Sequence, residues 1–400
     1  MSSCFSNIPM SPKDPIFGLS NDFQQDPRED KTNLLVGLYK KEGRPFVFPS
    51  IQESSVTSVA QCRSREYLPI GGDVEFCHFL SELVFGESVK GVQTLGGTGA
   101  LFAAGLFLKE QGVKTILLPI PTWPNHIRIF TDLGFEIQQC SLQGDDGTLD
   151  YKRLWEILEN SHHQWVLMDA CCHNPTGIDP SQTEWEKLAQ ISKQRGHKFI
   201  FDMAYLGFGE GIAADSQAVR FFQREQIEGL LCFSCSKNFT LYSERVGALF
   251  PLGIQKIENI ELFLSRMCYL VRSVYSSPPS FGSSVVKHVL GNATVKRGWL
   301  EELEQARLDL IQRRTMLVDA LKATSAPLLA DIAQSIDRQK GLFAYLNIAS
   351  ELITEIKEVE GIYLVGRGRL NLSALTSEGA SKLSHALRQL AGKPPSSGVG

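Results

Sequence analysis

Between residues 89 and 252 the sequence alternates short apolar runs with segments of helical periodicity, and this pattern restricts the possible folds more than any other feature. The apolar runs predict strands at 115–118, 165–169, 198–202, 231–235 and 247–250. The segments between them predict helices at 99–109, 150–158 and 183–193. Strands that alternate with helices favour a mostly parallel sheet covered by helices on both faces. The sequence therefore predicts an α/β fold.

The length of 400 residues exceeds what one small core needs and favours a large domain with a smaller one. Residues 297–321 predict one long helix of the kind that often joins two lobes, and short strands are predicted beyond it at 341–348 and 361–372. We predict a large domain at residues 46–305. The smaller α/β domain would combine an N-terminal arm and first part at 1–45 with residues 306–400.

Composition excludes several classes of protein. Forty basic and 44 acidic residues give a net charge of −4, which argues against nucleic-acid binding through bulk charge. No run of about 18 apolar residues predicts a membrane span. The first twenty residues lack a basic region followed by an apolar core, so we expect no secretory signal and a cytoplasmic location. The nine scattered cysteines predict reduced thiols, and Cys232 and Cys235 lack the second ligand pair of a zinc site, so no metal is expected.

Polar residues that suit one particular chemistry follow the predicted strands. Asp202 ends one strand, and the next is followed by Ser234, Ser236 and Lys237, with Arg245 eight residues after the lysine. A lysine beside two hydroxyls and an arginine suits a Schiff-base lysine next to a phosphate, which is the arrangement of pyridoxal phosphate chemistry. An aspartate at a strand end can hold the pyridine nitrogen of that cofactor in its protonated form.

A glycine run at 96–99 opens a predicted helix, where backbone N–H groups can approach a phosphate. Each of these elements also has an ordinary structural explanation. The segment 174–177 could be only a tight turn, Lys237 only a solvated lysine and Asp202 only a helix cap. Four such elements in order, each at a strand end, favour the functional interpretation.

Eight sequence blocks resemble the aspartate aminotransferases of the cytosolic type, which are fold type I pyridoxal phosphate enzymes. The blocks span almost the whole chain: EYLPI at 66–70, GGTGAL at 96–101, PTWPNH at 121–126, HNPTGID at 173–179, SKNF at 236–239, ERVG at 244–247, YSSPP at 275–279 and GRLN at 368–371. The resemblance implies a large domain with a mostly parallel sheet of the seven-stranded type, a smaller α/β domain and a homodimer.

The resemblance also implies a role for each matching residue. Lys237, Asp202 and Tyr205 would be catalytic, with Lys237 bound covalently to the cofactor and His126 supporting Asp202. Cofactor binding is implied for Gly97, Thr98, Trp123, Asn174, Asp202, Tyr205, Ser234, Lys237 and Arg245, and for Tyr67 reaching across from a second subunit. Substrate binding is implied for Arg369, Trp123 and Asn174, and for Arg272 from the second subunit.

The implied reaction is transfer of an amino group between L-aspartate and 2-oxoglutarate, giving oxaloacetate and L-glutamate. Two arginines suit a dicarboxylate, because each guanidinium can make a planar bidentate pair with one carboxylate. Two alternatives remain open at this point. One is another pyridoxal phosphate reaction on aspartate, such as racemisation, and the other is a non-catalytic dimer that only binds the cofactor.

The chain departs from the family pattern in several places, and three of the departures bear on activity. Leu35 and Leu38 stand where the family has Gly and Ala, in a segment expected to close over the substrate, so they would add bulk there. Asp169 replaces the usual His and is expected to place a second carboxylate near Asp202. Two close carboxylates resist joint ionisation, so one of them would hold a proton. These departures predict weakened transamination.

Overall fold

The computed structural model describes residues 8–10, 15–144, 149–323 and 326–391. Much of the N-terminal segment on which the cytoplasmic expectation rests lies outside these residues. Within the described part of the chain, no helix is both long enough and apolar enough to cross a membrane.

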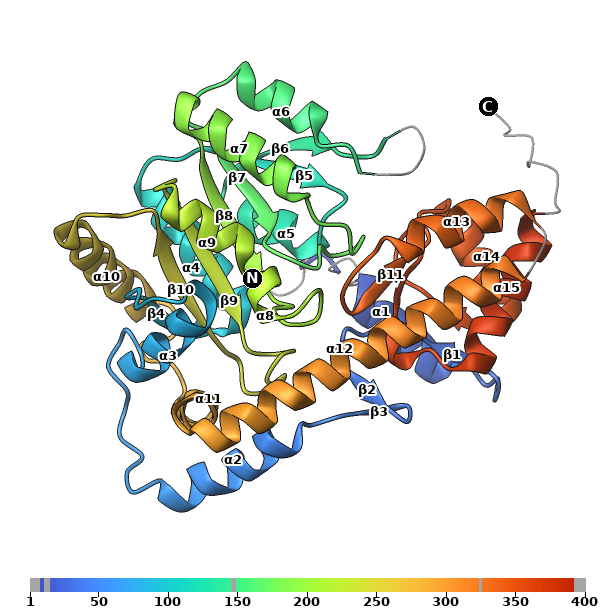
Figure 1. The fold of residues 1–400 in the computed structure, drawn as a ribbon, viewed down its shortest axis with the longest axis horizontal. Coiled ribbons are helices and arrows are strands. Elements are labelled where there is room, and N and C mark those ends of the chain that lie inside the picture. The colour runs from blue at the N-terminus through green and yellow to red at the C-terminus, as the bar shows by residue number, and fades with distance from the viewer. Residues whose placement is uncertain (1–7, 11–14, 145–148, 324–325, 392–400) are drawn as a thin grey trace, which may run out of the picture.

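A seven-stranded sheet forms the centre of the larger lobe (Figure 1). Its strands, in spatial order, are β4 (Val92–Leu95), β10 (Val246–Leu252), β9 (Gly229–Ser234), β8 (Lys198–Met203), β7 (Trp165–Asp169), β5 (Thr115–Ile120) and β6 (Glu136–Ser141). Only β10 runs antiparallel to its neighbours; the other pairs are parallel. The predicted α/β class and mostly parallel sheet are confirmed, whereas the sequence analysis missed β4 and β6. In β6 only Cys140 is buried, so this edge strand has no apolar run.

Alternate residues of the central strands enter two different cores. Ile200 and Leu230 face the core under α4 (Gly96–Glu110), α5 (Pro124–Asp132) and α10 (Ile257–Arg272), whereas Phe201 and Leu231 face the opposite core. The opposite core is covered by α3 (Val74–Phe85), α6 (Lys152–Glu159), α7 (Gln182–Arg195) and α9 (Gln217–Arg224). This period of two explains why both faces of a parallel sheet are apolar.

Helix α7, predicted at 183–193, is capped at both ends. Ser181 and Glu184 form a reciprocal capping box, and Gly196 ends the helix with a φ of 74°. The side chains therefore satisfy N–H groups that the first helical turn leaves without partners.

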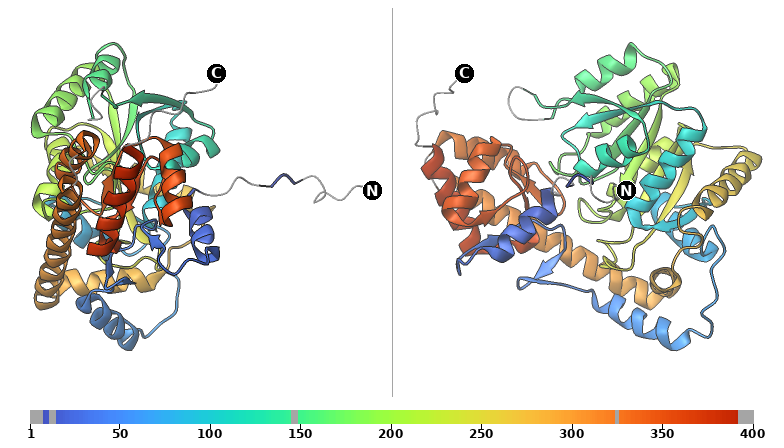
Figure 2. Two further views of the ribbon diagram at one scale, coloured as in Figure 1. Left: turned by 90° about the vertical axis from the view of Figure 1, so that its right-hand side faces the viewer. Right: turned by 180° about the vertical axis from the view of Figure 1, so that it is seen from behind.

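The long helix α12 (Ala293–Lys322) connects the two lobes. It packs on α2 (Pro49–Gln61) and α11 (Ser280–Gly291) at one end and on α13 (Pro327–Asp337) and α15 (Ser377–Ala391) at the other (Figures 1 and 2). The predicted boundary between residues 305 and 306 falls inside this continuous helix, and the division into domains stays a prediction.

Segments from both ends of the chain meet in the smaller lobe. Strand β1 (Thr32–Asn33), which follows α1 (Pro15–Gln25), pairs in parallel with β12 (Ile362–Tyr363), next to α14 (Ser350–Glu360). Strand β11 (Phe343–Tyr345) pairs antiparallel with β13 (Arg369–Asn371). The predicted strand at 361–372 is thus two short strands separated by a turn. The remaining elements are the hairpin β2 (Lys40–Lys41) with β3 (Arg44–Pro45), α8 (Ile212–Asp215) and the 3-10 helix η1 (Leu372–Ala374).

Candidate active site

A cavity of about 260 Å³ lies where β7, β8 and β9 end, facing the smaller lobe. This is where an open α/β sheet places its ligand. Most of the residues singled out from the sequence line it: Gly97, Thr98, Trp123, Asn174, Asp202, Tyr205, Ser234, Lys237, Arg245 and Arg369.

Asp202 is held by a chain of hydrogen bonds from behind. His126 Nε2 lies 3.0 Å from Asp202 Oδ2, and His126 Nδ1 lies 2.8 Å from the hydroxyl of Thr122. The second oxygen, Oδ1, is buried and has no hydrogen-bond partner. A buried carboxylate oxygen without a partner is costly, so its position fits a cationic donor inside the cavity.

Lys237 follows β9 and lines the cavity. Its Nζ lies 5.0 Å from the ring centroid of Tyr205. Burial lowers the pKa of Lys237 from 10.5 to about 8, although Asp202 acts in the opposite direction. A lysine with this pKa has a larger neutral, nucleophilic fraction near neutral pH than an ordinary lysine.

The start of α4 and Arg245 together form a cradle that suits an anion. Arg245 donates from Nη1 to the hydroxyl of Ser236 over 3.2 Å. A Cβ at Gly96 would lie 2.7 Å from Arg245 Nη2, and one at Gly97 would lie 3.0 Å from the Cβ of Ser234. Larger residues would close this space, where a helix N-terminus and a guanidinium meet.

Arg369 enters the cavity from β13. Its Nη1 donates to Asn174 Oδ1 over 3.2 Å and its Nη2 to the carbonyl of Leu35 over 2.9 Å. Its Cζ lies 4.2 Å from the ring centroid of Phe343. The buried Nε has no partner, and burial lowers the pKa of Arg369. A buried guanidinium without an acidic partner fits a carboxylate ligand.

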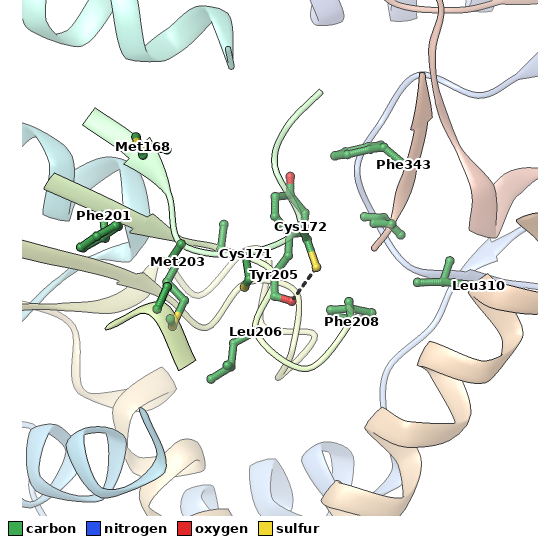
Figure 3. Close-up of a cluster of buried hydrophobic side chains, with 14 of the residues drawn as sticks. Met168, Cys171, Cys172, Phe201, Met203, Tyr205, Leu206, Phe208, Leu310 and Phe343 are labelled. Carbon is green, nitrogen blue, oxygen red and sulfur yellow. Dashed lines mark hydrogen bonds between the residues drawn. The ribbon is translucent and has the colours of Figure 1, made fainter. Parts of the chain in front are cut away.

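A cluster of buried side chains next to the cavity joins the two lobes (Figure 3). Cys172 donates from Sγ to the carbonyl of Tyr205 over 3.8 Å, and the rings of Tyr205 and Phe343 meet edge to face at 5.6 Å. Burial raises the pKa of the Tyr205 hydroxyl, which therefore stays protonated and can donate a hydrogen bond. The cysteines in the described residues are free thiols, as predicted.

Asp169 lies beside Asp202, as the sequence predicted. The two residues are register partners on the parallel strands β7 and β8, and both side chains line the cavity. Burial, and after it the charge of Asp202, raises the pKa of Asp169 well above its usual value. Asp169 therefore favours the protonated form.

The expectation for Leu35 is wrong. Its side chain is fully buried in a separate apolar cluster with Tyr363 and Val365, and the next residues, Val36 and Gly37, line the cavity. The backbone turns the Leu35 side chain away from the ligand space, so it does not add bulk there. Leu38 is half-buried and also does not line the cavity.

Two of the predicted site residues lie outside this cavity. The Tyr67 side chain is 93% exposed, and Arg272 is exposed and donates to Ser276 at the end of α10. Both had been expected to act in the site of a second subunit. Within one chain, neither of them lines the cavity.

The sequence analysis missed several residues at the site. Thr122 orients His126, and Phe343 lies under Arg369. Ile16 and Ala204 also line the cavity. Thr122 lies within a block that carried the resemblance, which could have indicated it; Ile16 is far from every such block.

Comparison with known proteins agrees with this geometry. Residues 29–387 match the family model for aminotransferase class I and II. The chain is 35% identical to an aspartate aminotransferase of Escherichia coli (strain K12), an alignment that covers 96% of this chain and 99% of the relative. It is 34% identical to an aromatic-amino-acid aminotransferase of Pseudomonas aeruginosa, with 97% and 99% covered.

Solved structures give the same result. The aromatic-amino-acid aminotransferase of Burkholderia pseudomallei, covalently bound to pyridoxal phosphate, superposes with a TM-score of 0.92 at 32% identity, covering 98% of this chain and all of the other. The cytoplasmic aspartate aminotransferase of Saccharomyces cerevisiae gives a TM-score of 0.92 at 27% identity, with 97% and 98% covered. The predicted family is confirmed: the chain belongs to the class I and II aminotransferases, a family of pyridoxal-phosphate-dependent enzymes.

Proposed function

We propose that this chain binds pyridoxal phosphate through Lys237 and transfers an amino group between L-aspartate and 2-oxoglutarate as a cytoplasmic homodimer, at a lower rate than its relatives. The observation that supports this most is the pairing of two unsatisfied groups in one cavity. Asp202 presents a free carboxylate oxygen and Arg369 a free guanidinium nitrogen. A cationic ring nitrogen and a substrate carboxylate would satisfy them.

The cofactor fits the groups on the cavity wall. Arg245, Ser234 and the backbone at Gly97 and Thr98 would bind its phosphate. Trp123 would stack on its ring. When bound, the cofactor supplies an electron-accepting ring that stabilises negative charge at the α-carbon of an amino acid.

The residues of this chain would move and hold the protons. Lys237, with its lowered pKa, would accept the proton from the α-carbon of the substrate and pass it to the cofactor. Asp202 would keep a proton on the ring nitrogen, and His126 would fix the orientation of Asp202. Asn174 and the protonated Tyr205 would donate hydrogen bonds to the phenolic oxygen of the cofactor.

Substrate selection would come from two arginines of different subunits. Arg369 would bind the α-carboxylate within its own chain, and Arg272 would reach the distal carboxylate in the site of the other subunit. An amino acid with a neutral side chain would leave the guanidinium of Arg272 without a partner, and a site of this kind strongly disfavours such a substrate. Aspartate and 2-oxoglutarate present two carboxylates each, and both would pass through the same site in alternation.

The lower rate would arise at Asp169. A second carboxyl group beside Asp202 competes with the ring nitrogen for a proton. When it holds that proton, it can donate a hydrogen bond to Asp202 in place of the ring nitrogen. While Asp169 holds that proton, Asp202 would hold the ring nitrogen less firmly, and the ring would accept electrons less well than with the histidine usual in the family at this position.

One assay tests the proposal and separates it from the alternatives. Purified protein with pyridoxal phosphate receives L-aspartate and 2-oxoglutarate, and oxaloacetate, L-glutamate and D-aspartate are followed together. We expect oxaloacetate and glutamate in equal amounts, loss of both with Lys237→Ala, and little product when L-phenylalanine replaces aspartate. D-Aspartate without oxaloacetate would favour racemisation, and cofactor binding without any product would favour a binding protein.

A further inference from the structure

Asp169 and Asp202 are placed side by side by the sheet itself. They are partners in the parallel register of β7 and β8, and the N–H of Ala170 donates to the carbonyl of Asp202 over 2.8 Å. Partners on adjacent parallel strands point to the same face at a strand spacing of about 4.8 Å. Backbone hydrogen bonds therefore hold the two residues at this separation, and a carboxylate oxygen of one lies within 4.8 Å of a carboxylate oxygen of the other.

Each aspartate has its own histidine and threonine behind it. Asp202 contacts His126, which contacts Thr122. Asp169 Oδ2 lies 3.6 Å from Nε2 of His173, and His173 Nδ1 lies 2.7 Å from the hydroxyl of Thr176. Burial, together with His126, lowers the pKa of His173 to about 3, so this imidazole is neutral and cannot balance the charge of Asp169.

Few positive groups reach Asp169. Its Oδ2 accepts one backbone N–H, from Asn174 over 3.2 Å. One ligand atom each of His126, Asp169 and Asp202 lies within 4.8 Å of the other two. Seven titratable groups act on Asp169 or respond to its charge. They come from α5, from β8, from the loops after β7, β8 and β9, and from the segment before α6: His126, Asp202, His173, Asp179, Tyr205, Lys237 and Tyr151. Lys237 is the one cation among them that does not depend on imidazole protonation.

We propose that Asp169 and Asp202 hold a single proton between them at neutral pH, and that Asp169 is a positioning residue that sets, through this proton, how strongly Asp202 holds the ring nitrogen of the cofactor. Two buried carboxylates at this separation, with so few donors, cannot both stay ionised. The inference rests on the proposed function, because it assumes that the free Oδ1 of Asp202 faces that nitrogen.

The sign of the effect follows from the charges. A protonated Asp169 carries no charge. If it donates a hydrogen bond to Asp202, it weakens the contact of Asp202 with the ring nitrogen; if it does not, it adds nothing to that contact. An ionised Asp169 adds a second negative charge beside the same nitrogen and favours its cationic form. Cofactor affinity should therefore rise as the pH rises through the titration of Asp169.

Cofactor binding to the purified, cofactor-free dimer tests this without any turnover. The affinity of the unmodified protein and of Asp169→Asn for pyridoxal phosphate is measured by quenching of tryptophan fluorescence between about pH 5 and pH 9, the range in which buried carboxyl groups titrate. The asparagine mimics the protonated form. We expect equal affinities at the acidic end and a ratio of about tenfold in favour of the unmodified protein at the alkaline end, equivalent to one pKa unit of coupling. The charge of Asp169 also acts on the pKa of Lys237, so the two proteins are compared in the Lys237→Ala background as well, where that titration is absent.

The controls separate the proton from the packing. Asp215→Asn removes another buried carboxyl group, which lies outside the cavity and accepts hydrogen bonds from three backbone N–H groups. The ratio of the cofactor affinities of the unmodified protein and Asp215→Asn should therefore not change with pH. Asp169→Glu should restore the rise, and Asp169→Ser gives a second neutral variant if the asparagine does not fold. A ratio that does not change with pH while all proteins bind the cofactor overturns the inference alone. Failure of the unmodified protein to bind the cofactor overturns the proposed function instead.

Discussion

Arg369 donates a hydrogen bond from Nη1 to Oδ1 of Asn174, 195 residues earlier in the chain, and so connects β13 of the smaller lobe to the loop after β7. The same guanidinium donates to the carbonyl of Leu35. Three segments distant in sequence thus meet at one side chain, whose buried Nε has no hydrogen-bond partner. A carboxylate bound here would contact both lobes.

Replacing Arg369 by Lys should raise the KM for aspartate by about ten- to a hundredfold. A lysine gives up the bidentate geometry, and hydrogen bonds to charged groups contribute about 1.5–3 kcal/mol. Steady-state kinetics measure this change. Arg367→Lys is the matched control, because Arg367 is exposed and bonds to Asn347 outside the cavity. Equal KM values for the unmodified protein and Arg369→Lys would contradict the assignment of Arg369.

Attachment of pyridoxal phosphate to Lys237 should accelerate with rising pH and reach half of its maximal rate near pH 8. Only the neutral amine attacks the aldehyde, and burial lowers the pKa of Lys237 to about 8. Below that value the amine is protonated and slow, and above it the rate levels off. Stopped-flow absorbance follows the reaction. The control is Nα-acetyl-lysine in solution, whose side-chain amine should have its ordinary pKa. A midpoint near that ordinary value would mean that the site does not activate the lysine.

Each active site should be shared between two subunits. Arg272→Ala and Lys237→Ala should each be inactive alone, and mixed dimers should recover activity in the site that has Lys237 from one subunit and Arg272 from the other. Tagged subunits allow the mixed dimers to be purified and assayed. Mixtures of Arg369→Ala with Lys237→Ala are the control, because these two residues line the cavity of one chain and no intact site can form. Recovery in the control, or none in the Arg272 mixture, would count against a shared site.

Leu35→Ala should destabilise the protein without increasing catalysis. The side chain is fully buried against Tyr363 and Val365, and removal of such a leucine costs about 2–5 kcal/mol. Denaturant unfolding measures the loss, and Leu38→Ala, at a half-buried position, should cost less. A gain in kcat/KM with unchanged stability would show instead that Leu35 obstructs the substrate, as the sequence had suggested.

The sequence alone determined the class of fold and most of the site. Alternating apolar runs and helical segments predict a parallel sheet, because only buried strands tolerate such runs on both faces. Lys237 and Asp202 could be assigned because each lies at or just after the end of a predicted strand, and the ends of parallel strands meet at one edge of the sheet. Arg245 precedes the antiparallel strand β10, so it lies at the same edge. The helix predicted at 183–193 depends on an equally local pattern, and the structure has it at Gln182–Arg195.

The tertiary structure decided where side chains point and which distant segments meet. Leu35 lies in the segment that was expected to border the ligand. Its side chain nevertheless enters a neighbouring core, whereas the next residue, Val36, lines the cavity. The strand pair β1 and β12, and the contact of Arg369 with Asn174, join residues more than 190 positions apart, for which no local pattern exists. The proximity of Asp169 and Asp202 was expected, but the register of β7 and β8 fixed it, because backbone hydrogen bonds between strands determine which residues become neighbours.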